Sequence, residues 1–585
     1  MNSNFKYLLF TAALAWSAGS VGSAAGQDLE SIKTANPITV SGGVGLTNTL
    51  YSASSESRKD PWSYVLNASL NLNVLGVLDL PFSACIMSEN KTFNHPTFAR
   101  YGVSPRYKRI TAHIGWRSMQ FSTYTLSGVT FLGGGVEVAP DDFWIGGKAV
   151  YGRFNKSVPL GDTLSPSYEQ PQYERWGYGG MVTLGTREHN ADIIIFKARD
   201  EKGAHDSVMA ALGIAPQENA VVGLNTRHAV GEHITFELEY AFSALTSDVN
   251  QPYKKFDTYT YANNFGAFFR PRTSSSYHHA LRTSLGFQAE LFSLGVAYNR
   301  VDPGYQSLGT LYLTNDFEDI QANGGLNLLK GKLGLSGAVG VQRDNLSNLQ
   351  AATSTRYISS LNVTYTPLQQ LSLSGSYSNF NSSSQPNQLI VDDSIKYAQV
   401  TDNISLAASY GFGEGDCKHA LNGAYSNQAA NTLNSTFTQV DKSVTGMHSV
   451  SLGYRLSYAP LDWSNAVNLS YNNLSVDNAQ NTSYGYNFSS TKSLLKKQLK
   501  ATLGYSFIHS SSDQGGRRSN VARLSLAYGY KKHSLTLSGS GSFIKSHSAG
   551  KGAAHTQEWM ANFSYAYSFA AALWKAKKPV ESKDL

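Results

Sequence analysis

Charged side chains are scarce in this chain, and the few that interrupt its alternating segments are candidate recognition groups. Of 585 residues, 15% are Asp, Glu, Lys or Arg. A guanidinium or carboxylate on the wall of a water-filled passage would attract or repel a charged or polar solute. A structural role is the alternative, because Arg and Glu on neighbouring strands can form an ion pair within the wall. The residues that we single out are Arg117, Glu137, Arg153, Arg300 and Arg343.

The histidines and glycines form no pattern that is typical of an enzyme or a metal site. His278 and His279 are the one adjacent histidine pair in the sequence. Successive side chains of a strand point to opposite faces, so these two could not share one metal ion there. The sequence GGGVE (133–137) is glycine-rich but lacks the lysine of a phosphate-binding loop. We therefore expect no catalytic residue, no metal, no cofactor and no enzymatic activity.

Alternation with a period of two residues dominates the chain and predicts β-strands. In LSLSGSYSNF (371–380), leucines, a glycine and a tyrosine alternate with serines, so one face is apolar and the other carries hydroxyls. The segments ITFELEYAF (234–242), LTLSGSGSF (535–543) and WMANFSYAYSF (559–569) repeat this pattern. Helical periodicity does not extend beyond a few turns after the first 25 residues. The sequence therefore predicts an all-β fold.

The direction of the apolar faces separates two architectures. In soluble β-sandwiches they are buried between two sheets, whereas in a transmembrane barrel they face lipid and the polar faces line a lumen. The strand-like runs reach about ten residues or more, which is the length that spans a bilayer. The polar faces are rich in Ser, Asn, Thr and Gly, and aromatic residues gather towards strand ends. We predict one closed transmembrane antiparallel β-barrel, with soluble β-sandwiches as the alternative.

Short and long connections alternate along the chain, as in barrels whose periplasmic turns are short. About eleven short turns, from residues 76–77 to residues 531–532, imply about 22 strands, and a first and a last strand bring the estimate to about 24. Between Arg106 and Ala139 there is one strand-like run too many. If MQFSTYTLSG (119–128) also crosses the membrane, the count becomes about 26; if one piece folds inward, it stays near 24.

The N-terminus carries a signal for export. Residues 1–25 combine Lys6, an apolar run and small residues at 23–25, which is the layout of a cleavable secretory signal peptide. The apolar run is shorter than the roughly 20 residues of a spanning helix. We therefore predict a signal peptide over residues 1–25, the barrel over residues 26–570 and a short periplasmic tail over residues 571–585.

Three segments resemble known outer-membrane proteins. NFSYAYSF (562–569) resembles the C-terminal targeting strand of bacterial outer-membrane proteins, which ends on a phenylalanine, although this chain continues beyond Phe569. Residues 100–158, beginning RYGVSPRYKR, and residues 298–346, beginning YNRVDPGYQS, resemble large porin-like barrels of the Bacteroidota. The resemblance implies contact with lipid in the outer membrane of a Gram-negative cell. It supplies no activity and no site residue.

A barrel of this size encloses a wide lumen, and barrels of about 22 strands are commonly plugged. Strand-like sequence begins at Ile38, which leaves too few residues after the signal peptide for an N-terminal plug domain. We expect occlusion by internal loops, by a partner protein, or none. Residues 90–109 are a candidate for packing inside the lumen, with an exposed loop as the alternative. An arginine facing lipid at mid-depth costs about 2–4 kcal/mol, so the five charged residues are expected to face the lumen or lie near an interface.

The sequence therefore predicts a wide pore, gated by loops or by a partner, that passes or exports polar solutes or polypeptide. A periplasmic or cell-surface protein would be the partner. The alternative is a non-conducting scaffold that anchors or assembles a surface partner. The net charge of +7 is spread along the chain, so no nucleic-acid partner is expected. Whether Cys85 and Cys417 pair is left open by the sequence.

Overall fold

The computed structural model describes the chain between Ile38 and Trp574, with gaps. The described residues are 38–55, 59–75, 78–88, 100–139, 144–160, 171–203, 206–255, 257, 268–350, 352–386, 396–435, 440–477, 479–548 and 551–574. The predicted signal peptide lies outside them. The last strand continues to Trp574, past the predicted end of the barrel at residue 570.

Of the described chain, 76% forms strands. Besides them there are a short helix, α3 (Asp206–Ala211), and one 3-10 turn, η3 (Ala459–Leu461). Neither these nor any other helix among the described residues has the length and apolar character to cross a membrane. The strands are β1 (Ile38–Ala53), β2 (Trp62–Val74), β3 (Leu78–Met87), β4 (Arg100–Val103), β5 (Arg106–Tyr107), β6 (Ile110–Ser118), β7 (Thr130–Val138), β8 (Ile145–Asn155), β9 (Glu174–Gly185), β10 (His189–Glu201), β11 (Glu218–Val230), β12 (Ile234–Thr246), β13 (Ser275–Gln288), β14 (Phe292–Val301), β15 (Phe317–Leu328), β16 (Leu333–Asp344), β17 (Ala352–Leu368), β18 (Leu371–Pro386), β19 (Lys396–Phe412), β20 (Cys417–Ser435), β21 (Val440–Tyr458), β22 (Trp463–Val476), β23 (Ala479–Leu494), β24 (Leu499–Ser512), β25 (Gly515–Tyr530), β26 (His533–Ser548) and β27 (Lys551–Trp574).

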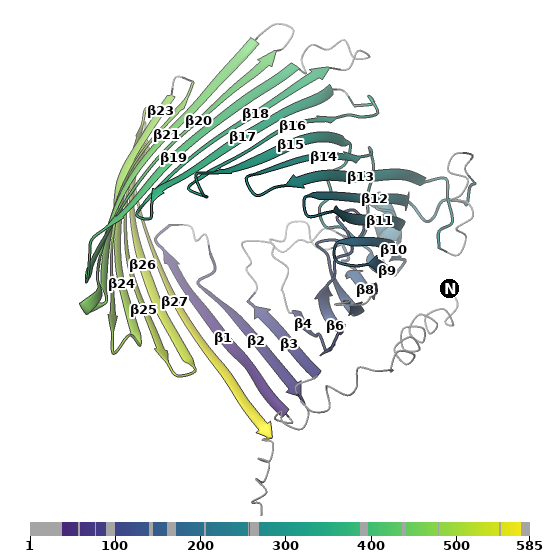
Figure 1. Cartoon of the computed structure of the whole chain (residues 1–585), viewed down its shortest axis with the longest axis horizontal. Helices are drawn as coiled ribbons and strands as arrows, with labels where there is room; N and C mark the ends of the chain where they lie inside the picture. The colour runs from purple at the N-terminus through teal and green to yellow at the C-terminus, as the bar shows by residue number, and fades with distance from the viewer. Residues whose placement is uncertain are drawn as a thin grey trace, which may run out of the picture.

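The strands close into one antiparallel barrel, as the sequence predicts. Each strand pairs with the next position in the wall, and β1 returns to pair with β27 from Ile38 to Ala53. Figure 1 shows this seam, with purple β1 beside yellow β27. The short strands β4 and β5 share one position, because both lie between β3 and β6. The described strands thus make a barrel of 26 positions, an even number that closes antiparallel pairing.

One hairpin explains why the count is 26 although residues 119–128 do not cross. Tyr107 stands opposite Ile110, and Lys108 in the turn between them has a φ of +51°. Two-residue hairpin turns need such positive φ values. This turn adds two wall positions, so the expectation that an inward-folded segment would keep the count near 24 was wrong. Of residues 90–109, the candidate for packing inside the lumen or for an exposed loop, residues 100–107 carry β4 and β5 in the wall, and residues 90–99 lie outside the described residues.

Alternation assigns each strand residue to one of two faces, and ladder partners share a face. The inner face contacts two segments inside the barrel, described below; Phe196, on this face, is fully buried. The outer face carries large exposed apolar side chains, among them Leu406 (52% exposed) and Leu452 (58%). Following ladder partners from β18 to β24 along the inner face gives an unbroken tier of small polar residues: Ser376, Ser405, Ser426, Ser449, Asn472, Ser483 and Ser510.

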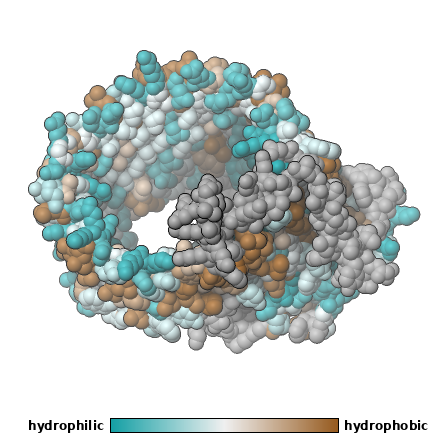
Figure 2. Space-filling view, turned by 60° about the horizontal axis from the view of Figure 1, so that its bottom comes forward, coloured by the Kyte–Doolittle hydropathy of each residue, from teal (hydrophilic) through white to brown (hydrophobic). Residues whose placement is uncertain are grey.

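The two faces therefore have the polarity of a membrane barrel, with an apolar outside and a hydroxyl-rich inside. Figure 2 shows an opening through the ring, and the inner wall visible behind it is mostly pale or teal. Aromatic rings border the apolar band near the short turns, where Phe412 stacks on His419 and His533 packs against Tyr567. Such rings are typical of the girdles at membrane interfaces.

Reversing polarity on adjacent residues of β21 tests this assignment of faces. Leu452→Arg places a charge towards lipid, and we expect it to destabilise the folded barrel by about 2–4 kcal/mol. Ser451→Arg, one residue away on the inner face, should change stability little because water hydrates the guanidinium. Urea unfolding in lipid vesicles, followed by heat-modifiable gel migration, measures both. Equal losses for the two variants would contradict the assignment.

Candidate functional site in the lumen

Two segments without regular structure lie inside the barrel. The first inner segment, residues 119–129, joins β6 to β7 and buries Met119, Phe121, Tyr124 and Leu126. Glycines on the inner face of the wall make room for it. A Cβ at Gly223 would lie 2.9 Å from the Thr125 methyl carbon, and one at Gly179 would lie 3.0 Å from the Phe121 ring. The wall is therefore shaped to hold this segment closely.

The second inner segment, residues 302–316, joins β14 to β15 and packs against the first. Ser127 and Thr310 form a parallel β-bridge between the two. The Tyr305 hydroxyl donates to the Tyr124 carbonyl (2.9 Å), and the Ser307 hydroxyl donates to the Thr125 carbonyl (2.5 Å). Because the partners are more than 170 residues apart in sequence, only the closed barrel brings these segments together.

Buried polar side chains of the wall anchor the second inner segment. Asn219 on β11 is fully buried; its amide donates to the Ser243 hydroxyl (2.8 Å) and its Oδ1 accepts from the Leu308 backbone N–H (3.1 Å). The Ser243 hydroxyl in turn donates to the Gln306 carbonyl (2.6 Å). A buried polar group that loses such partners costs about 1–3 kcal/mol. These bonds therefore fix where the segment lies.

Tyr124 links both inner segments to polar residues of the wall, one of them charged. Its hydroxyl donates to Asn299 Oδ1 (2.6 Å), and its backbone N–H donates to Glu239 Oε1 (3.2 Å). Burial raises the pKa of the Tyr124 hydroxyl, and the Glu239 carboxylate raises it further. The pKa of Tyr305 is also raised, again first by burial. Both tyrosines therefore stay protonated and keep donating at and well above neutral pH.

Two of the five predicted site residues, Arg117 and Glu137, lie on the inner face, where Arg117 stands opposite buried Phe131. Arg117 Nε donates to Ser104 Oγ (2.8 Å), and Glu137 lies 3.7 Å from Lys148 Nζ. They belong to one polar cluster on β6–β8. The structure thus brings these two charges together and adds Ser104 and Lys148, which the sequence did not point to.

His113 completes this cluster and raises the question of a nucleophilic serine. His113 Nδ1 lies 2.9 Å from Ser104 Oγ, and its Nε2 lies 3.9 Å from Glu137 Oε1. The second distance is too long for a hydrogen bond, and Arg117 already donates to Ser104 Oγ. A base held by its acid within hydrogen-bond reach is what activates a serine. This arrangement is therefore a hydrogen-bonded wall network and lacks the geometry of that mechanism.

The other three predicted site residues stand on the outer face, near the long-loop ends of their strands. Arg153 shares this face with exposed Tyr151 and lies 3.8 Å from Glu174. Arg300 and Arg343 both bind Glu318, the first at 3.3 Å. These are cross-strand ion pairs, the structural alternative considered for the sequence, at the edge of the apolar band.

Further charged residues on the inner face of β11–β15 were not among those predicted from the sequence. Arg227 pairs with Glu237 at 3.5 Å, and Glu239 stands opposite Arg282. The alternation in ITFELEYAF carries the signal that could have found them, because both glutamates lie opposite its apolar face. The inner wall of this part of the barrel is therefore charged but largely paired.

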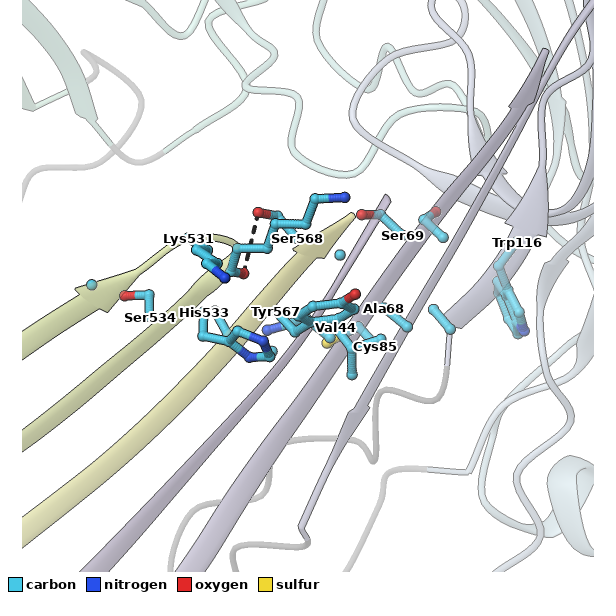
Figure 3. Close-up of a pocket in the computed structure, with 18 of the residues that line it drawn as sticks. Val44, Ala68, Ser69, Cys85, Trp116, Lys531, His533, Ser534, Tyr567 and Ser568 are labelled. Carbon is cyan, nitrogen blue, oxygen red and sulfur yellow. Dashed lines mark hydrogen bonds between the residues drawn. The ribbon is translucent and has the colours of Figure 1, made fainter. Parts of the chain in front are cut away.

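A separate hollow of about 890 Å³ lies at the seam, where β27, β1, β2 and β3 meet. Figure 3 shows it between Tyr567, Val44 and Ala68, with His533 and Trp116 towards its ends. Cys85 lines it, and this thiol is free, as is that of Cys417 on β20. Cys85 and Cys417 therefore do not form a disulfide in this structure.

Removing the Asn219 anchor tests how the second inner segment is held. Asn219→Ala leaves the Leu308 N–H without its partner and removes one of the two donors to the Gln306 carbonyl. We therefore expect protease cleavage within residues 302–316 to become at least about tenfold faster, which corresponds to about 1.4 kcal/mol. Asn225→Ala is the matched control, because the Asn225 side-chain oxygen on the same strand is buried without a hydrogen-bond partner. Equal cleavage of the two variants would contradict the anchoring role.

No family model matches this chain, and no curated protein is similar to it. Among solved structures, the P pilus usher PapC translocation pore is similar with 8% identity and a TM-score of 0.38, covering 91% of this chain and 100% of that one. The siderophore receptor PirA of Pseudomonas aeruginosa is 12% identical with a TM-score of 0.35, covering 92% and 81%. OprD of Pseudomonas aeruginosa is 11% identical with a TM-score of 0.31, covering 59% and 88%. Such identities carry no substrate or partner over to this chain.

Proposed function

We propose that the protein is an outer-membrane pore whose lumen is narrowed from one side by its two inner segments. The observation that carries this proposal is the continuous tier of small polar side chains on the inner face of β18–β24, from Ser376 to Ser510. A wall of hydroxyls and amides suits hydrated, polar solutes, because each can exchange hydrogen bonds with water at little cost.

The inner segments support a narrowed rather than a sealed passage. Their buried contacts are with β6–β14, through residues such as Phe131, Ile194 and Val301. Among the described residues, their hydrogen bonds reach the connection between β16 and β17, where Leu346 N–H donates to Asp316 (2.8 Å), and none reaches the strands from β16 to β27. The passage would then lie between the inner segments and the hydroxyl-rich wall.

We also propose that the pore lies in the outer membrane and that a gate controls passage through it. The export signal over residues 1–25, the targeting strand ending at Phe569 and the Bacteroidota-like segments favour the outer membrane of a Gram-negative bacterium. The inner segments are the candidate gate within the chain, and a periplasmic or cell-surface protein is the candidate external one. Small polar solutes and extended polypeptide are both compatible with the uncharged tier.

Conductance with site-directed labelling tests the pore. In a Cys85→Ser/Cys417→Ser background, Ser449→Cys places a thiol on the inner tier and Val450→Cys places one on the outer face. We expect the purified protein to conduct in planar bilayers, and a bulky thiol reagent to lower the conductance by roughly a quarter or more at position 449, because it fills part of the water path.

The Val450→Cys variant is the control, and its conductance should not change on labelling. A barrel that remains silent in every condition, with Ser449→Cys folded and labelled, would overturn the pore. That result together with a surface protein that co-purifies in equal amounts would favour the scaffold instead.

A further inference from the structure

The stretch of chain that forms β20 to β26 has an uneven charge balance. Residues 417–548 contain thirteen Lys and Arg, four Asp and no Glu. This excess of nine positive charges is larger than the net charge of the whole chain, +7. Three of the aspartates lie in connections between strands: Asp462, Asp477 and Asp513. The strands of this half therefore carry mostly cations.

Five of these cations stand on the inner face. Arg517 is the ladder partner of Ser510, and the other four form what we call the basic wall: Lys418, Arg455, Lys500 and Arg523. Arg455 and Arg523 lie on one row of ladder partners that crosses five strands. The residues between them are small: Ala466, Ser489 and Gly504. Since adjacent strands are about 4.8 Å apart, the two arginines stand roughly 19 Å apart, and the wall between them carries only these small residues on this row.

Among the residues that the structure describes, no acidic group forms an ion pair with the basic wall. All four of its side chains are exposed. The ion pair found among the described residues 417–548, Lys497 with Asp462 at 3.1 Å, joins two short turns, one between β21 and β22 and one between β23 and β24. On the other half of the inner face, Glu137 and Glu237 each have a cationic partner. The unpaired charge on the inner face of β20–β25 is therefore positive.

A polar hollow adjoins the basic wall. It measures about 220 Å³ on the inner face of β18–β22, and Ser409, Asn422, Ser451 and Asn468 line it. Gly453, which also lines it, is two residues from Arg455 on the same face of β21. Hydroxyl and amide groups beside a guanidinium are the donors that carboxylate, phosphate and sulfate groups accept from.

We propose that the basic wall and this hollow form a binding station for anionic, hydrophilic solutes that carry carboxylate, phosphate or sulfate groups. The inference deepens the proposed function, on which it rests for the path that brings the solute there. A partly enclosed wall of one charge sign raises the local concentration of the opposite ion, so the station would favour anions along the lumen.

The local potential beside the basic wall can be measured with charged thiol reagents. In the Cys85→Ser/Cys417→Ser background, Asn468→Cys places a thiol in the hollow. The full-length protein, folded in detergent, is modified with sulfonatoethyl (anionic) and trimethylammonioethyl (cationic) methanethiosulfonate, each rate being normalised to that of free cysteine. We expect the anionic reagent to react faster, and Arg455→Glu/Arg523→Glu to lower the anionic-to-cationic ratio at least about threefold at low salt.

Arg518→Glu/Lys545→Glu is the matched control. It makes the same charge change on β25 and β26, but on the outer face, where Arg518 stands opposite Lys545. Its ratio should stay at the starting value. Heat-modifiable migration verifies folding, and Arg455→Gln/Arg523→Gln replaces the glutamate pair if that pair does not fold.

An unchanged ratio in the folded inner-face variant, or an equal change in the control, would overturn the binding station. The readout needs access to the lumen but no current across a membrane. A barrel that conducts yet shows no reagent preference would overturn the station and leave the pore standing. A silent barrel with the expected ratio would overturn the pore and support the station.

Discussion

The structure depends on the closure of backbone hydrogen bonding. In a bilayer no water can satisfy an unpaired N–H or C=O group, so a sheet survives there only if it has no free edge. The closing ladder joins β1 to β27, strands that are about 500 residues apart in sequence, and side chains reinforce it, as where Thr47 and Ser564 hydroxyls lie 3.1 Å apart. All other neighbours in the wall are consecutive positions. The inner and outer faces, and hence the lumen, exist only because this one distant pairing forms.

The polarity of the inner face differs from one part of the closed wall to another. Around β18–β24 the inner face follows the simple rule of a wet lumen. On β7–β14 it does not, because Phe196, Val221 and Val301 are apolar, inward and fully buried. The two inner segments cover them, so these residues form a small protein core inside a membrane barrel. The lumen therefore has one side built like a globular interior and another built like a hydrated surface. Solutes would meet both.

The sequence predicts the fold class well because alternation is a local property. The ten residues LSLSGSYSNF are enough to predict which side chains share each face of their strand, and the barrel has the serines on one face and the leucines on the other. The hairpin at Lys108 was missed because two cationic residues in succession are no turn signal. The inner segments were out of reach for a different reason. Their anchors, such as Asn219 to Leu308, join residues far apart in sequence, and nothing in either segment alone encodes the contact.

The sequence contains part of the information needed to predict which face of the wall each charged residue lies on. Arg300 shares its parity with Val296 and Tyr298, and Arg343 shares its parity with Val339 and Val341, which marks both as outward. The prediction of lumen-lining residues used their charge and did not use this parity. The lone cations of β20–β25 were overlooked for the opposite reason, because their distribution is visible only when charge is counted strand by strand. Parity and local charge balance together say more about such a wall than either does alone.

The unequal strand lengths have a consequence for the shape of the rim. Strands β7 and β14 have 9 and 10 residues, whereas β20 and β21 have 19 each. All begin or end at short turns on one side, so the extra residues, about 3.3 Å apiece along the strand, extend the wall on the opposite side. The strands therefore end at unequal heights on that side, so that the sheet edge is oblique and the wall stands higher at β20 and β21 than at β7 and β14.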